Sequence, residues 1–287
     1  MKTTAIEDMK GRVCLISGAT SGVGRAIAEG LVRRNATVVL LSRDRQRAKE
    51  VARRFSARNP NARTEAMEVD LSLQKSIRSF VAHFTKRHER LHVLVNAAGV
   101  LMFERRLTED EIEMTVAVDY LGHFLLTNLL IPLLLRSAPS RVLTVAGSPR
   151  MMKKTKVDFD DIQHEQCFRG IETAQQAAVL RVLFTYALAR RLQGTGINAN
   201  AFHPGRVRTR LLKYAPCWGR MVSAIVRPFL KNNCDTGVYL ASSPGLEGVN
   251  GKYFVGTSAV SFQPEWVDDS TLRKLWRLSC TLTGVGE

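Results

Sequence analysis

Residues 13–28 read VCLISGATSGVGRAIA, and this stretch decides the fold. An apolar run leads into a glycine-rich turn, and a helical pattern follows it. Gly18, Gly22 and Gly24 allow the backbone to turn tightly and approach a diphosphate, while the helix N-terminus offers free N–H groups to the anion. We therefore expect a dinucleotide to bind at Gly18, Ser21, Gly22, Val23 and Gly24. A strand–helix turn that binds nothing is the alternative.

Apolar runs recur along the chain, near 13–16, 37–41, 93–95, 142–146 and 197–202. Longer helical segments separate them. This alternation predicts an α/β fold, a Rossmann-like doubly wound parallel sheet with helices on both faces. The 287 residues are 45% apolar, and no linker rich in proline or glycine and no repeat divides them. We expect residues 1–287 to form a single dinucleotide-binding domain.

The end of the second expected strand carries an arginine, Arg43. An acid at this place accepts hydrogen bonds from a ribose 2′-hydroxyl, whereas an arginine suits a 2′-phosphate. We therefore expect NADP(H) rather than NAD(H), with Arg25 as a second contact. The alternative is that both arginines are solvated surface charges, because this stretch is rich in arginine.

Three further segments carry a recognisable pattern: Val69–Leu71, Val95–Gly99 and His203–Thr209. With the glycine-rich turn, they resemble the short-chain dehydrogenase/reductase family, and nearly the whole chain is similar to its retinol-dehydrogenase-like branch. The resemblance implies a short-chain dehydrogenase-like domain and an oxidoreductase activity. It also implies further cofactor contacts at Asp70, Leu71, Asn96, Ala98, Gly99, Pro204, Gly205 and Thr209.

The catalytic positions of that family are replaced in this chain. The family carries a Tyr-x-x-x-Lys pair on one helix face, and the two places here are Ala174 and Ala178. The catalytic serine place falls on Gly147, and the asparagine place falls on Asp119. The residues after Ala178 follow the branch pattern without a gap, so the register holds. We expect an atypical active site without the family's proton-transfer groups.

Few side chains offer themselves as replacements. Ser148 could supply a displaced hydroxyl, although a turn residue before a proline is the simpler interpretation. Asp119 could act as an acid or base, or could only support loop backbone. Gln175 and Gln176 could hydrogen-bond a substrate, although they fit a helix surface better, and His164 fits a surface loop. The catalytic residues stay unknown from sequence.

The segment 210–230 is mixed and apolar, and it includes Met221, Val222, Ile225 and Val226. In the family this region closes over the substrate, so the resemblance implies a substrate lid here. An apolar or aromatic small molecule is the expected substrate, although a packed surface helix gives the same pattern. The resemblance also implies a homo-oligomer, paired through long helices near 108–136 and 172–194.

The five cysteines are scattered and show no metal-binding spacing. We expect a reducing compartment, no disulfide framework and no metal. The N-terminus does not have the pattern of a signal peptide. The longest apolar stretch, Phe124–Leu135, is too short to span a bilayer. These observations predict a cytoplasmic protein with no transmembrane segment.

The formal charge of +16 favours anionic partners in general. Much of it lies in 43–63, which we expect to be one helix and its flanks. No nucleic-acid motif accompanies the charge, so a solvated basic face is expected and specific nucleic-acid binding is not.

Three functions remain open. The first is a non-standard NADPH-dependent reductase that passes hydride to a quinone or a conjugated polyketide-like acceptor. The second is a non-redox cyclase or isomerase that uses the old pocket to orient its substrate. The third is a pseudoenzyme that binds the cofactor as a sensor or scaffold. Because function belongs to the site and not to the fold, the resemblance alone does not choose among them.

Overall fold

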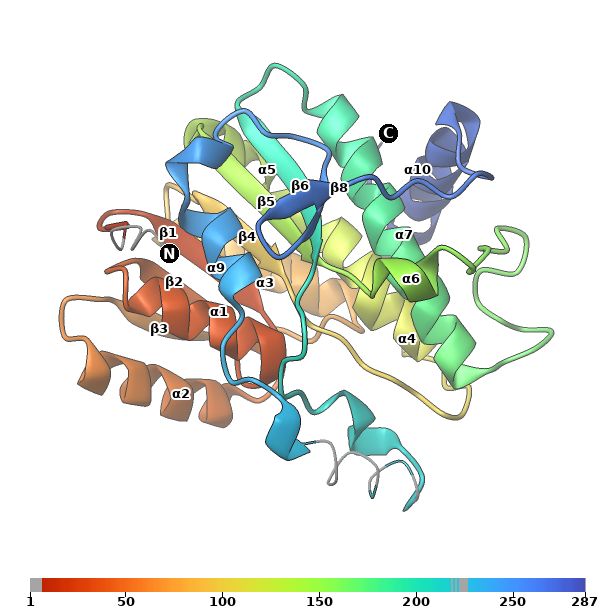
Figure 1. Ribbon diagram of the computed structural model, residues 1–287, viewed down its shortest axis with the longest axis horizontal. Helices are drawn as coiled ribbons and strands as arrows, with labels where there is room; N and C mark the ends of the chain where they lie inside the picture. The colour runs from red at the N-terminus through yellow and green to blue at the C-terminus, as the bar shows by residue number, and fades with distance from the viewer. Residues whose placement is uncertain (1–6, 218, 220, 222–226, 287) are drawn as a thin grey trace.

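A computed structural model describes residues 7–286 except 218, 220 and 222–226 (Figure 1). Over these residues one eight-stranded sheet has the order β3-β2-β1-β4-β5-β6-β7-β8. Its neighbouring strands pair in parallel, apart from the antiparallel pair β7–β8 at one edge. The strands are β1 (Val13–Ser17), β2 (Thr37–Ser42), β3 (Thr64–Glu68), β4 (Val93–Asn96), β5 (Ser140–Val145), β6 (Ile197–His203), β7 (Tyr253–Val255) and β8 (Ser258–Val260).

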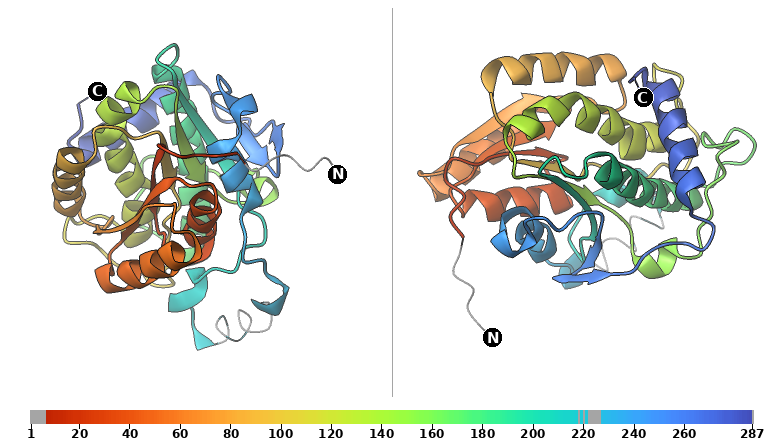
Figure 2. Two further views of the ribbon diagram at one scale, coloured as in Figure 1. Left: turned by 90° about the vertical axis from the view of Figure 1, so that its left-hand side faces the viewer. Right: turned by 90° about the horizontal axis from the view of Figure 1, so that it is seen from above.

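Helices cover both faces of the sheet, as Figure 2 shows. One layer consists of α1 (Gly22–Val32), α2 (Arg45–Arg58) and α9 (Asp235–Ser242), and its core includes Ile16 and Val38. The other layer is built from α3 (Gln74–Arg87), α5 (Gly122–Arg136), α7 (Gly170–Arg191) and α10 (Asp269–Thr283), and its core includes Leu15 and Val39. Successive strand residues thus alternate between two buried layers, which explains why the strands are continuous apolar runs. The Rossmann-like doubly wound α/β fold is confirmed.

The strand order reverses between β1 and β4, because β2 and β3 lie on one side and β5 to β8 on the other. In open parallel sheets the crevice at such a reversal, outside the carboxyl ends of the strands, is the usual ligand site. The glycine-rich turn follows β1 directly. The fold therefore opens a crevice at the turn that the sequence singled out.

The search for apolar runs in the sequence did not identify strand β3, because this strand is polar. It reads TEAME, and most of its residues are only partly buried because it lies at the edge of the sheet. At the other edge β8 is exposed in the same way, whereas β7 is apolar and buried but only three residues long. Edge strands are exposed on one side and need no continuous apolar pattern.

One long helix begins later than expected, at residue 114 instead of about 108. It is made of α4 (Met114–Val116), a π-helical turn η1 (Ala117–Leu121) and α5. Before it, Leu107 forms a bridge with Glu113, whose side chain then accepts a hydrogen bond from the Val116 N–H and caps the helix. The 23 residues from Met114 to Arg136 are long and apolar enough to cross a membrane, but 72% of the most apolar part is buried inside this fold. That burial is typical of a core helix.

The expected lid is described only in part. Short 3₁₀ turns occupy η2 (Leu211–Tyr214) and η3 (Arg227–Phe229). Met221 and Phe229 are exposed. Val222, Ile225 and Val226 lie outside the described residues. A lid over substrate remains a prediction.

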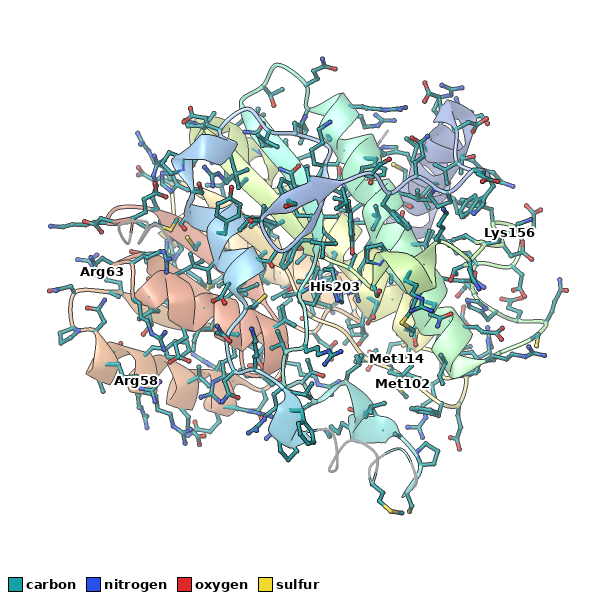
Figure 3. All side chains as sticks on the ribbon, viewed as in Figure 1. Arg58, Arg63, Met102, Met114, Lys156 and His203 are labelled. Carbon is teal, nitrogen blue, oxygen red and sulfur yellow. The ribbon has the colours of Figure 1, made fainter. Side chains whose placement is uncertain are left out.

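Basic side chains are distributed over the whole length of the molecule. Figure 3 labels Arg58 and Arg63 at one end of the long axis and Lys156 at the other. Helix α2 buries only Ala48, Val51, Ala52 and Phe55, so most of its arginines face outward, whereas Arg47 is partly buried. This arrangement agrees with a solvated basic face.

Candidate functional site

The glycine-rich turn is packed against the turn that follows β4. Gly18 has a φ of +64°, and a Cβ there would lie 2.8 Å from the Ala98 Cα. The Ser17 hydroxyl oxygen accepts hydrogen bonds from the N–H groups of Ala97 (2.9 Å) and Ala98 (3.0 Å). A Cβ at Gly24 would lie 2.8 Å from the carbonyl oxygens of both Ser17 and Gly18. Both turns therefore require small residues and meet in one crevice.

A cavity of about 550 Å³ occupies this crevice along the carboxyl ends of the strands. Most of the predicted cofactor contacts line it, and the cavity also collects all five positions singled out for catalysis. The lining cofactor positions are Gly18, Ser21, Gly22, Val23, Arg43, Asp70, Leu71, Ala98, Gly99, Pro204 and Thr209. The lining catalytic positions are Asp119, Gly147, Ser148, Ala174 and Ala178.

The predicted second contact Arg25 is not among the lining residues. Three more predicted contacts, Gly24, Asn96 and Gly205, are not among them either. Asn96 is fully buried, and its amide nitrogen donates a hydrogen bond to the Thr127 hydroxyl at 3.0 Å. Gly205 has a φ of +77° and open space around it. In this structure these residues shape the turns instead of facing the cavity.

One end of the cavity, which we call the adenosine end, is strongly cationic. Arg43 follows β2, and its Nη2 donates a hydrogen bond to the Tyr214 hydroxyl at 2.7 Å. Arg47, Arg210 and Lys213 line the same cavity. Burial and the charge of Arg210 lower the pKa of Arg47. The sequence analysis identified Arg43 as a phosphate contact. It did not single out Tyr214, Arg47, Arg210 or Lys213.

The other end, the nicotinamide end, brings together the replaced catalytic positions. A Cβ at Gly147 would lie 3.3 Å from the Ala178 Cβ and 3.3 Å from both Cγ and Sδ of Met152. Met152 is almost fully buried and lines the cavity with Ala174. Gly147 and Ala178 therefore lie next to each other. The apolar side chain of Met152 packs against Gly147, where the family carries its serine.

Asp119 and Arg181 form a buried ion pair at the nicotinamide end. Arg181, on α7, is only 7% exposed. Its Nη2 lies 2.5 Å from the Asp119 Oδ2, and the other Asp119 oxygen, Oδ1, accepts a hydrogen bond from the Val100 N–H at 2.7 Å. Burial raises the pKa of Asp119, whereas Arg181 and the Val100 N–H lower it. At this distance from a guanidinium we expect an ionised carboxylate at neutral pH.

The remaining contacts of Arg181 are with backbone. It donates hydrogen bonds to the carbonyl oxygens of Asp119 (2.5 Å), Val145 (3.1 Å) and Ala98 (3.4 Å). Of the two roles considered for Asp119, these contacts match support of the loop backbone. Sequence reasoning missed Arg181, although a lone charge in the apolar stretch VLRVLF (179–184) was a usable signal.

Other candidates are more easily placed. Ser148 precedes the short helix α6 (Pro149–Met152), as a turn residue would. Gln175 lines the cavity, whereas Gln176 is not among the lining residues.

The assignment of His164 to the surface was wrong: it is 7% exposed, and its pKa is lowered chiefly by burial. Its loop folds back onto the start of α4, where the Gln163 side chain accepts a hydrogen bond from the Glu113 N–H.

Lys213 and Tyr214 are the lysine and tyrosine among the described residues that line this cavity. Tyr214 is bound to Arg43, which follows β2, while Gly147 follows β5. Three strand spacings separate β2 from β5, or about 14 Å. Neither residue therefore stands in for the Tyr–Lys pair at the nicotinamide end.

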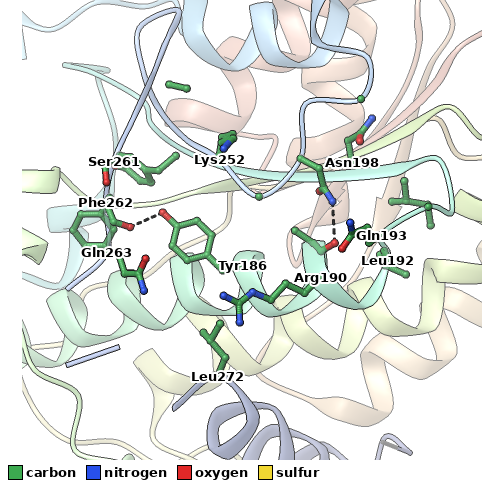
Figure 4. Close-up of a pocket in the computed structure, with 18 of the residues that line it drawn as sticks. Tyr186, Arg190, Leu192, Gln193, Asn198, Lys252, Ser261, Phe262, Gln263 and Leu272 are labelled. Carbon is green, nitrogen blue, oxygen red and sulfur yellow. Dashed lines mark hydrogen bonds between the residues drawn. The ribbon is translucent and has the colours of Figure 1, made fainter. Parts of the chain in front are cut away.

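A second cavity, of about 950 Å³, lies at the other end of the sheet (Figure 4). It is lined by Ile197 and Asn198 at the start of β6, and by Tyr186, whose hydroxyl donates a hydrogen bond to the Phe262 carbonyl oxygen at 2.6 Å. None of the residues predicted to bind cofactor lines it. The crevice at the carboxyl ends of the strands therefore remains the candidate site.

Comparisons with known proteins agree with this geometry. The family model described as short chain dehydrogenase matches residues 12–155. Retinol dehydrogenase 14 from Mus musculus is 38% identical over 96% of this chain and 87% of its own length. Retinol dehydrogenase 12 from Homo sapiens is 35% identical over 96% and 88%.

Solved structures show the same fold. The crystal structure of an uncharacterised protein from Mycobacterium paratuberculosis has a TM-score of 0.74 and 27% identity, covering 97% of this chain and 95% of that one. A short chain dehydrogenase from Burkholderia cenocepacia, in complex with NADP, has a TM-score of 0.64 and 20% identity over 86% and 97%. From its glycine-rich turn, its strand order and these relatives, we conclude that the chain belongs to the short-chain dehydrogenase family, in the retinol-dehydrogenase-like branch.

Proposed function

We propose that this protein binds NADP(H) and acts as a non-standard reductase, passing hydride to an acceptor that stabilises its own negative charge. A quinone or a conjugated carbonyl compound is such an acceptor. One observation carries the proposal: a single cavity joins a cationic adenosine end to a nicotinamide end that holds Gly147, Ala174 and Ala178.

The phosphorylated cofactor is favoured by charge. Arg43 stands where a 2′-phosphate is recognised in this kind of fold, and no acid takes its place there. Arg47 and Arg210 add further positive charge to the lining. A guanidinium offers a planar fork of donors that matches a phosphate. The solved relative with NADP carries the same fold, which supports this choice.

The acceptor class follows from the missing acid. Reduction of an ordinary ketone develops alkoxide charge, and a positioned acid typically contributes about 10²–10⁴-fold to the rate. Hydride donation itself is the chemistry of the cofactor. An acceptor with delocalised charge depends less on the lost groups.

An apolar ligand suits the nicotinamide end. Met151, Met152 and Ile171 line the cavity beside the replaced positions. The names of the retinol dehydrogenases among its relatives also support an apolar small molecule as substrate.

The proposal is tested in two steps. Titration calorimetry should detect NADPH binding that is tighter than NADH binding. Stopped-flow absorbance should then show NADPH oxidised faster by a soluble quinone than by a simple ketone of similar size. Tight NADPH binding without turnover on any quinone of a panel would contradict the reductase activity.

A cofactor-binding pseudoenzyme is the second candidate, and the Asp119–Arg181 pair favours it. Arg181 directs four of its five N–H donors to three carbonyl oxygens and one carboxylate. A guanidinium also stays protonated in proteins, so Arg181 is no proton donor to a substrate. This candidate predicts NADP(H) binding with no consumption of NADPH, and a pull-down whose captured partners depend on NADP(H).

A further inference from the structure

Two segments far apart in the sequence supply the cations at the adenosine end. Arg43 and Arg47 come from the end of β2 and the first turn of α2, whereas Arg210 and Lys213 come from the chain after β6. Carboxylates also lie near these cations. Asp44 caps α2 by accepting a hydrogen bond from the Arg47 N–H at 2.9 Å, the charge of Glu50 acts to raise the pKa of Arg47, and Asp70 lines the same cavity. Four positive charges therefore share one end of a cavity.

A direct contact holds the two segments together. The Tyr214 hydroxyl accepts a hydrogen bond from the Arg43 Nη2 at 2.7 Å, across 171 residues of sequence. The Lys213 ammonium lies 5.0 Å from the centre of the Tyr214 ring, within cation–π range. The short turn Leu211–Tyr214 is thus tied to the arginine that the sequence assigns to a 2′-phosphate.

The positive charges of Arg43, Arg47, Arg210 and Lys213 repel one another. A phosphate dianion bound between them would relieve that repulsion. Burial and the charge of Arg210 already lower the pKa of Arg47, which indicates that the two guanidinium groups affect each other. Arginine–phosphate contacts are strong because they are charge-assisted and can be bidentate. The arrangement therefore suits an anion bound between the segments.

We propose that residues 210–214 form the second half of the 2′-phosphate site of this protein. Arg43 and Arg47 bind the phosphate from one side, Arg210 and Lys213 bind it from the other, and Tyr214 holds the turn in place through Arg43. The inference rests on the proposed NADP(H) binding and extends it. It makes 210–214 a determinant of the choice between NADP(H) and NAD(H), and it couples the position of this turn to the phosphate.

The test measures binding of NADPH, NADH and 2′,5′-ADP by titration calorimetry. In the double variant Arg210→Ala/Lys213→Ala, affinity for NADPH and 2′,5′-ADP should fall at least tenfold, or about 1.4 kcal/mol. Affinity for NADH should change less than about twofold, because it lacks the phosphate. The control is Arg53→Ala/Arg54→Ala, which removes the same charge from exposed positions on α2 outside the cavity lining.

A second measurement follows the turn itself. Trypsin cleaves after arginine and lysine, so cleavage after Arg210 and Lys213 should slow several-fold with NADPH and not with NADH. Tyr214→Phe removes the hydrogen bond to Arg43 and should speed the same cleavage in protein without cofactor.

The outcomes separate the two proposals. A wild-type protein that binds neither cofactor overturns the proposed function and this inference with it. Wild-type protein that prefers NADPH, combined with an unchanged preference in Arg210→Ala/Lys213→Ala, overturns only the inference. An equal loss of NADPH affinity in the Arg53→Ala/Arg54→Ala control overturns it as well, because net charge would then explain the effect.

Discussion

The two ends of the 550 Å³ cavity differ in their side chains, because the adenosine end is cationic and the nicotinamide end is largely apolar. At the adenosine end, Arg43, Arg47, Arg210 and Lys213 present more positive charge than one phosphate needs. Among the described residues at the nicotinamide end, the one cation, Arg181, is turned onto a carboxylate and backbone carbonyls. Under the proposed function, cofactor binding and proton transfer depend on separate residues of this fold, so one can be lost while the other is kept.

The largest expected effect tests the nicotinamide end. Arg181→Leu leaves the Asp119 carboxylate buried without its partner, which should cost about 3–5 kcal/mol of folding free energy. Urea denaturation followed by circular dichroism measures this loss.

The matched control for this change is Asp119→Asn/Arg181→Leu, which removes both charges and keeps an oxygen to accept from the Val100 N–H. It should recover part of the stability, because the carbonyl oxygens of Asp119, Val145 and Ala98 still lose their donor. If the double variant were as unstable as Arg181→Leu, the pair would not be the reason for the loss.

The next prediction concerns the turn that both ends share. Gly18→Ala forces a side chain into left-handed backbone, at roughly 1–3 kcal/mol, and presses its Cβ against the Ala98 Cα. Because the steric contact adds to the backbone cost, we expect the total loss of stability to exceed the backbone cost alone. Calorimetry should detect no measurable NADPH binding.

Gly11→Ala is the control, because Gly11 has a φ of +81° and nothing within 4 Å of its Cβ position. It should show only the backbone cost, about 1–2 kcal/mol, with NADPH binding intact. Equal effects at the two glycines would remove the packing argument.

A gain of function would sharpen the contrast further. Restoring the family pair with Ala174→Tyr/Ala178→Lys places an acid at the nicotinamide end, and reduction of a simple aldehyde should rise by about 10²-fold in kcat/KM. The variant Ala174→Phe/Ala178→Lys adds similar bulk without the hydroxyl. Equal rates in both variants would show that the missing acid is not what limits the reaction.

The smallest effect concerns pH and a residue outside the cavity. His92 precedes β4, and its Nδ1 accepts a hydrogen bond from the Val13 N–H at 3.0 Å. Burial lowers the pKa of His92 to about 4. Between about pH 6.5 and 4 the unfolded chain binds a proton that the folded chain does not, so stability should fall as the pH drops through that window.

His92 should contribute at most about 1.4 kcal/mol per pH unit to this slope. His92→Asn keeps an acceptor for the Val13 N–H and does not titrate, so its stability curve should be flatter over the same window. Parallel curves would refute the assignment to His92. The measurement also separates the pH response of folding from that of phosphate binding at the adenosine end.

The sequence predicted the fold and most of the cavity lining well, and it predicted long-range pairing poorly. The turn at Gly18 and the replaced positions Ala174 and Ala178 could be identified because each belongs to a short motif with fixed spacing. The role of Arg181 could not, because its partners come from Ala98, Asp119 and Val145, on other elements. The contact between Arg43 and Tyr214 joins residues 171 positions apart, and no pattern along the chain indicates it.

Errors arose where tertiary packing overrode local character. His164 is a polar residue in a loop, which favours the surface, yet its loop folds inward and buries it. The polar strand β3 was missed because its place at the sheet edge removes the need for an apolar run.

The packing of Met152 has a consequence for any substitution of Gly147. A Cβ at Gly147 would lie 3.3 Å from the Cγ and Sδ of Met152, so a serine there would need the Met152 side chain to shift. A serine at position 147 should therefore be better tolerated beside a smaller side chain at position 152. Rebuilding a hydroxyl at this place is then a matter of changing two neighbouring positions together.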